Sequence, residues 1–256
     1  QDISLVGITA GAGETQLLQV TAVSDNAGLI PNPTVTYTSN ELDGSLAYTP
    51  LGDASGTAVV TVTVTDAGLD NDLQTIADNA SFSRTFTVTV NAVNDPPLLD
   101  AIGDPAAIDE DDGQQSVSLA GITAGAGETQ TLQVTATSDN TGLIPDPTVT
   151  YTSDETTGSL AYTAVADASG TAVVTVTVTD AGLDDDLQTI ADNASSAGTC
   201  AGTVSTANDP PLLDAVSDPS AIDEDDGLQS VSLTGITAGA GETQTLQVTA
   251  TSDNTG

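Results

Sequence analysis

The sequence predicts an all-β protein built from tandem β-sandwich domains, on three observations. The string GITAGAGETQ occurs three times, and its first glycine falls at Gly7, Gly121 and Gly235, so the repeat is 114 residues long and has no insertions. Segments within each repeat alternate threonine with valine, which is typical of strands with one buried face. Gly, Pro, Asn or Asp separate these segments, as in turns, and helix signals are absent.

Seven segments of the complete repeat are predicted to be strands. In chain order they are LLDAI (98–102), QSVSLA (115–120), TQTLQVTAT (129–137), TVTYTS (148–153), GSLAYT (158–163), TAVVTVTVTD (171–180) and a last one near 199–206. Seven strands in about 114 residues is the number found in an immunoglobulin-like sandwich. The core must consist mainly of Val, Leu, Ile and Ala, because the chain has no Trp or Met and only two Phe.

The repeat period predicts three domains that are joined end to end. Residues 1–96 form a repeat that lacks its first strand, because Gln1 aligns with Gln115. Residues 97–210 form a complete repeat, and residues 211–256 form the N-terminal part of a third. We interpret the sequence as an excerpt from a longer array. No apolar run approaches the roughly 18 residues that a membrane span needs, so we expect no membrane insertion in this segment.

The charge of the chain excludes several functions. There are 37 acidic residues and one base, Arg84, for a formal net charge of -36. Nucleic-acid binding is excluded, because it depends on Lys and Arg to neutralise phosphate. Without histidine, and with Cys200 as the single cysteine, the chain has no Ser-His or Cys-His pair for nucleophilic catalysis. Paired carboxylates can hydrolyse glycosides, but the lack of Trp leaves few aromatic platforms for sugar, and we expect no enzyme.

The acidic residues gather in three clusters per repeat: the Asn-Asp linker, the IDEDDG turn and the loop DAGLDDDLQTIADN (180–193). Such oxygen ligands suit calcium, and a chain without histidine has no ordinary zinc site. The predicted Ca²⁺ ligands are Asn94, Asp95, Asp109, Glu110, Asp112, Asp66, Asp180, Asn208, Asp209 and Glu224. Two alternatives stay open: the acidic turns are merely solvated, or the acidic surface keeps the protein soluble in high salt.

The join TFTVTVNAVNDPP (85–97), the acidic IDEDDG and the later DASGTAVVTVTVTD (167–180) together resemble the tandem cadherin-like or immunoglobulin-like repeats of large bacterial surface proteins. The resemblance to cadherins themselves is more distant. Together the two resemblances imply an extracellular, cell-surface location. They also imply calcium shared at each domain junction, with Asn208, Asp209 and Glu110 at one junction and Asn94 and Asp95 at another. The chain departs from cadherins where it runs directly into two prolines (96 and 97), which also stiffen a joint without metal.

These observations favour a non-catalytic extracellular array: the stalk or filament of a surface or adhesin protein, stiffened by calcium at the domain junctions. Its expected partners are neighbouring repeats of the same chain and other copies of the chain in a fibre. Two alternatives are a carbohydrate- or protein-binding repeat module and a spacer within a larger secreted enzyme. The loops are nearly identical between copies, which favours a spacer, because a binding module needs variable loops.

The two copies differ most in the last predicted strand, which reads SFSRTFTVTV at 81–90 and SSAGTCAGTV at 195–204. The alternation places Phe82 and Phe86 on the buried face of the first copy, where the second copy has Ser196 and Cys200. We therefore expect the second repeat to be the less stable. One hypothesis is that a neighbouring chain covers the weakened strand and that Cys200 pairs between chains; the alternative is local divergence without a partner.

Overall fold

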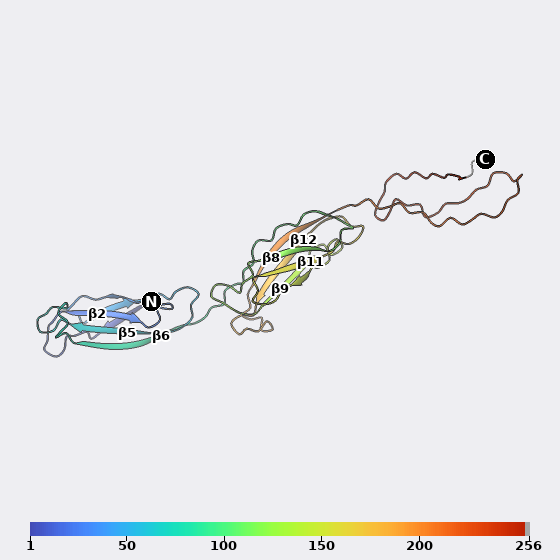
Figure 1. Cartoon of the computed structure of the whole chain (residues 1–256). Helices are drawn as coiled ribbons and strands as arrows, with labels where there is room; N and C mark the ends of the chain where they lie inside the picture. The colour runs from blue at the N-terminus through green and yellow to red at the C-terminus, as the bar shows by residue number, and fades with distance from the viewer. Residues whose placement is uncertain (254–256) are drawn as a thin grey trace. The chain divides into compact units, whose positions relative to one another are not determined.

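A computed structural model describes residues 1–253, and the strands in that part of the chain fall into two compact units (Figure 1). Unit 1 comprises Gln1–Asp95 with two later loops, Ala124–Gln130 and Gly182–Asn193. Unit 2 comprises Pro96–Thr123, Thr131–Ala181 and the chain from Ala194 onward. The described residues contain strands and turns but no helix, so none crosses a membrane as a helix, and the all-β prediction is confirmed.

Unit 1 consists of two antiparallel sheets of three strands. The first sheet has the order β1-β4-β3, with β1 at Asp2–Val6, β4 at Asp43–Ala47 and β3 at Thr34–Thr36. The second has the order β2-β5-β6, with β2 at Leu18–Ser24, β5 at Gly56–Asp66 and β6 at Ser81–Val90 (Figure 1). Leu18 and Val20 of β2 and Val60 and Val62 of β5 face inward, whereas the threonines and Val23 face outward, because successive side chains of a strand alternate between its faces. The resulting core is made of aliphatic side chains: Ile8, Leu18, Val20, Ala22, Leu29, Ile30, Leu46, Ala58, Val60, Val62 and Val88.

Unit 2 repeats this arrangement and adds one short strand. The order β10-β11-β8 forms one sheet, with β10 at Thr148–Thr150, β11 at Thr157–Tyr162 and β8 at Gln115–Ala120. The order β7-β13-β12-β9 forms the other, with β7 at Ile108–Asp109, β13 at Ser195–Ser205, β12 at Gly170–Asp180 and β9 at Leu132–Ser138. β7 pairs parallel to β13, whereas the other ladders of the unit are antiparallel.

The start of the complete repeat differs from the prediction. Residues 98–102 are not a strand, because only an isolated bridge links Leu98 to Thr123 there, and the Asp100 N–H donates to the Ala120 carbonyl at 3.0 Å. After this contact with β8, the segment passes Pro105 and pairs with the edge of β13 as strand β7. Proline lacks the N–H that a continued ladder needs. This crossing segment, residues 98–109, therefore contacts the edges of both sheets of unit 2.

Residues 211–253 contain no strand; an isolated bridge joins Leu212 to Thr237. The predicted domain ends at 96 and 210 follow the sequence repeat. The compact units do not coincide with them, since two loops that belong to the second sequence repeat are part of unit 1. The repeat bounds therefore stay a prediction about sequence modules.

Candidate functional site: paired carboxylate clusters

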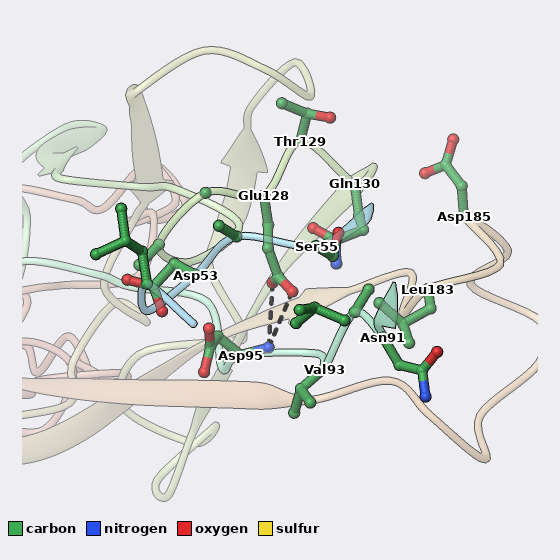
Figure 2. Close-up of a pocket in the computed structure, with 16 residues that line it drawn as sticks. Asp53, Ser55, Asn91, Val93, Asp95, Glu128, Thr129, Gln130, Leu183 and Asp185 are labelled. Carbon is green, nitrogen blue, oxygen red and sulfur yellow. Dashed lines mark hydrogen bonds between the residues drawn. The ribbon is translucent and has the colours of Figure 1, made fainter. Parts of the chain in front are cut away.

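The site in unit 1 forms where the glycine-rich loop at 125–130 packs on the Asn-Asp segment. The Asp95 N–H donates to both carboxylate oxygens of Glu128, at 3.1 and 3.2 Å, and the Gln130 side-chain amide donates to Asn94 Oδ1 at 2.8 Å. Figure 2 shows the Glu128 carboxylate directed at the backbone of Asp95. The two short polar contacts hold the loop against the segment.

Glycine is required in this loop by close approach and by backbone conformation. Gly125 and Gly127 both have positive φ, at 125° and 72°. A Cβ at Gly127 would lie 2.6 Å from the carbonyl oxygen of Asp53, and a Cβ at Gly125 would lie 3.2 Å from that of Asp95. The loop therefore brings Glu128 next to two other acidic residues because it has no side chains at these positions.

A cavity of about 530 Å³ opens beside these groups within unit 1 (Figure 2). Its lining includes the acidic residues Asp53, Asp95, Glu128 and Asp185 and contains no basic residue. Asn91, Ser55, Thr129 and Gln130 add further oxygen atoms to the lining. The charged groups of the cavity lining are therefore all carboxylates.

Unit 2 contains the same contacts 114 residues later. The Asp209 N–H donates to Glu242 Oε1 at 2.9 Å, and the Gln244 amide donates to Asn208 Oδ1 at 2.8 Å. A Cβ at Gly241 would lie 3.4 Å from the carbonyl oxygen of Asp167, which is the counterpart of Asp53. Two sites in one chain are therefore built by the same sequence elements.

Electrostatic crowding is clearest in unit 2. Burial raises the pKa of Asp209, and the negative charges of Asp111, Asp167 and Glu242 raise that pKa further. Asp167 also shares a side-chain hydrogen bond with Asp209. The Oε2 atom of Glu242 is buried and has no hydrogen-bond partner among the described residues. Three acidic side chains therefore act on the Asp209 carboxyl group at this site.

Some predicted ligands lie close to this cluster. Glu110 is buried, and its Oε1 accepts a hydrogen bond from the N–H of Ala207 at 2.9 Å, one residue before Asn208. Asp109 and Asp112 close the acidic turn, where the Asp109 N–H donates to Asp112 Oδ2 at 3.0 Å. Glu224, the counterpart of Glu110 in the third copy, is exposed.

Two predicted ligands instead close loops within their own sandwich. Asp66 Oδ1 accepts hydrogen bonds from the N–H groups of Ala80, at 2.9 Å, and Gly68, at 3.0 Å, and these bonds lower the pKa of Asp66. Asp180 is fully buried, and its Oδ1 accepts from the Ala194 N–H at 2.8 Å. Both carboxylates bind backbone N–H groups across a 14-residue loop, so they are not grouped with the linker residues.

The acidic neighbours of the Asn-Asp segments were not among the predicted ligands; they are Asp53, Glu128, Asp111, Asp167 and Glu242. One signal was present, because the glutamate of GAGETQ recurs in all three copies. Within residues 1–253, no group of three or more His, Cys, Asp or Glu side chains is close enough to hold a metal ion as it stands.

Comparisons with known proteins gave distant structural likenesses. No protein-family model and no curated sequence matches the chain. Among solved structures, domains 4 and 5 of the S-layer protein SbsC are 19% identical (72% of this chain, 70% of that chain, TM-score 0.32). Protocadherin gamma B2 extracellular cadherin domains 3–6 are 14% identical (77% of this chain, 44% of that one, TM-score 0.40). Titin domains Z1Z2 in complex with telethonin are 13% identical (80% and 89%, TM-score 0.32). These scores are low, so the fold assignment rests on the strand topology described above.

Proposed function

We propose that the chain is a non-catalytic structural array of an extracellular surface protein, a stalk or filament, and that calcium binds at its carboxylate clusters. The supporting observation is that burial, and after it the negative charges of Asp111, Asp167 and Glu242, raise the pKa of Asp209. Charges of one sign that are packed together repel, and a bound cation removes that repulsion.

The chemistry of both clusters fits calcium. This ion takes six to eight oxygen ligands from carboxylates, amide and backbone carbonyls and water, in a flexible geometry. Unit 2 offers the four carboxylates and the unpartnered Glu242 Oε2. Unit 1 offers Asp53, Asp95 and Glu128 around its cavity. The groups do not form a closed cage, so the loops have to tighten around the ion, as expected of weak extracellular sites.

The position of the clusters explains why calcium would stiffen the array. In unit 1, Asp53 and Asp95 come from the first sequence repeat and Glu128 comes from the second. An ion held by all three would fix residues of consecutive repeats to one another. No feature of the described residues favours the binding-module or enzyme-spacer alternatives.

Thermal unfolding of the full chain tests this proposal. Calcium at about 1 mM over a site of about 10⁻⁴ M should stabilise each site by about 1.5 kcal/mol, relative to sodium at matched ionic strength. Glu128→Gln and Glu242→Gln should each reduce the shift. Glu155→Gln is the control, because Glu155 is an exposed glutamate that belongs to neither cluster. An unchanged midpoint would reject calcium and leave the acidic-surface alternative.

A further inference from the structure

The chain enters and leaves the two sheets of unit 2 along one edge of the sandwich. It enters through the crossing segment, which ends as β7, and it leaves through β13. β7 and β13 pair in parallel, with Ile108 opposite Val204 and Asp109 opposite Ser205. The two strands on which tension along the chain acts are therefore bonded directly to each other.

Two carboxylates extend this short ladder beyond its ends. Asp104 Oδ1 accepts the Ala201 N–H at 2.7 Å before the ladder, and Glu110 Oε1 accepts the Ala207 N–H at 2.9 Å after it. Both bonds join residues that are 97 positions apart, so they follow one register. The Glu110 N–H also donates to the Ser205 carbonyl at 3.0 Å. Carboxylate acceptors make stronger hydrogen bonds than neutral ones, and the extended ladder has one at each end.

Apolar packing and a bond to the other sheet hold the first part of the segment. Leu99 and Ile102 pack on β13, where a Cβ at Gly198 would lie 3.3 Å from Leu99 Cδ2 and 3.4 Å from Ile102 Cδ1. The Asp100 N–H donates to the Ala120 carbonyl at 3.0 Å. The segment therefore cannot slide along β13 without losing close packing as well as hydrogen bonds.

Tension loads a parallel pair of this kind in shear. Pulling on the chain draws β7 toward its N-terminal end and β13 toward its C-terminal end, and in a parallel pair these directions are opposite along one axis. The bonds are then loaded together and have to break in one step. An antiparallel pair at this edge would instead open from one end, one bond at a time.

We infer that residues 98–110 are a mechanical clamp, which holds unit 2 closed against tension along the chain, and that Asp104 and Glu110 supply its load-bearing side-chain bonds. The inference rests on the proposed stalk or filament role, in which the chain carries tension. It does not require calcium, because each bond joins two groups of the protein. The other ladders of unit 2 are still formed when the clamp breaks, so rupture of the clamp sets the rate of forced unfolding.

Single-molecule pulling at constant force, in EDTA, tests the clamp. Full chains with Cys200→Ala are attached through Val93→Cys and Leu213→Cys, two exposed positions on either side of the sheets of unit 2 in the sequence. Asp104→Ala and Glu110→Ala should each raise the unfolding rate under force at least about fivefold, as expected for the loss of a hydrogen bond to a charged acceptor. Asp104→Asn keeps an acceptor oxygen and should have a smaller effect.

Asp139→Ala is the matched control. Asp139 Oδ1 accepts the Val173 N–H at 2.7 Å, the same length as the Asp104 bond, and both aspartates are exposed. The Asp139 bond joins the end of β9 to β12, which is not loaded when the clamp breaks. Urea unfolding without force should show similar losses of stability for the two alanine variants, whereas only Asp104→Ala should accelerate unfolding under force.

Three results would each overturn the clamp. They are an unchanged rate under force in Asp104→Ala, an equal acceleration by Asp104→Ala and Asp139→Ala, and an early lengthening by about the length of residues 98–110. The last result would show that the segment detaches before the sheets unfold. The proposed calcium sites are tested separately by a thermal shift, so either idea can fail while the other holds.

Discussion

The last strands of the two units, β6 and β13, align residue by residue but bury their inner faces in different ways. β6 carries large side chains, yet Phe82 is 61% exposed and Phe86 packs at a tilt of 42° against Tyr48. β13 carries small ones, yet Cys200 is only 4% exposed, and Leu99 and Ile102 pack on the strand at Gly198. A sandwich can therefore supply core volume from a crossing segment instead of from the strand itself.

The expectation that the second repeat is the less stable stays a prediction, but one premise of it changes. The sequence placed both phenylalanines on a buried face, and this is wrong for Phe82. The volume that β13 lacks is offset by the crossing segment. The hypothesis of a disulfide between chains is also disfavoured, because Cys200 is buried and the pKa of its thiol is raised by burial and then by Asp104.

The largest effect is expected when the first copy is given the glycine of the second. Val88 is buried in unit 1, whereas a Cβ on its counterpart Gly202 would lie 2.5 Å from Ile144 Cδ1. Val88→Gly should lower the free energy of unfolding by about 3 kcal/mol, through lost burial and a more flexible strand. Urea unfolding measures this. Val93→Gly, at an exposed position after the strand, is the control and should change stability far less.

The cover of β13 can be removed directly. Leu99→Ala or Ile102→Ala should each destabilise unit 2 by about 2 kcal/mol, because each side chain packs on Gly198. The matched changes Leu213→Ala and Val216→Ala affect exposed side chains and should have little effect on a dilute, monomeric chain. Equal losses in both pairs would show that the crossing segment does not stabilise unit 2.

Lowering the pH should change the stability of the two units in opposite directions, because the pKa of Asp66 in unit 1 is lowered and the pKa of Asp209 in unit 2 is raised. The pKa of Asp66 is lowered by backbone hydrogen bonds from Ala80 and Gly68. The stability that ionised Asp66 contributes is fully present above the pKa of Asp in the unfolded chain, about 3.9. It is lost as pH falls through the pKa of Asp66 in the folded chain. The pKa of Asp209 is raised by burial and neighbouring charge, so its ionised form opposes folding. Protonation of Asp209, as pH falls through its folded pKa toward about 3.9, should increase stability.

Urea unfolding at several pH values separates the two effects. Asp66→Asn should remove the loss of stability below about pH 3.9, and Asp209→Asn should remove the gain above it. An acid profile identical to wild type in Asp209→Asn would contradict the carboxylate crowding.

The smallest effect is expected at Phe82, one of the two phenylalanines that the alternation places on the buried face of β6. Phe82→Ser should cost less than about 1 kcal/mol in the monomer, because most of the Phe82 side chain is already exposed. Phe86→Ser should cost more, because Phe86 is partly buried against the core of unit 1 and its ring contacts that of Tyr48. A larger loss for Phe82 than for Phe86 would show that the Phe82 side chain is buried in solution.

The sequence by itself determined the all-β class, the 114-residue repeat and most strands. β12, predicted at 171–180, lies at Gly170–Asp180, because alternation of Val and Thr is a local pattern that places one face inward whatever the partner strand is. It also located the Asn-Asp segments to which polar loops attach. Calcium at these segments stays a prediction.

Only the tertiary structure decided the contacts between distant segments. Residues 98–102 were predicted as a strand, but the segment crosses from β8 to β13, 97 residues away at the Asp104 to Ala201 hydrogen bond. Glu128 and Glu242 became site residues because a glycine loop lets them reach Asp95 and Asp209. Periodicity reports which way a side chain points, and it carries no information on which remote segment fills the space in front of it.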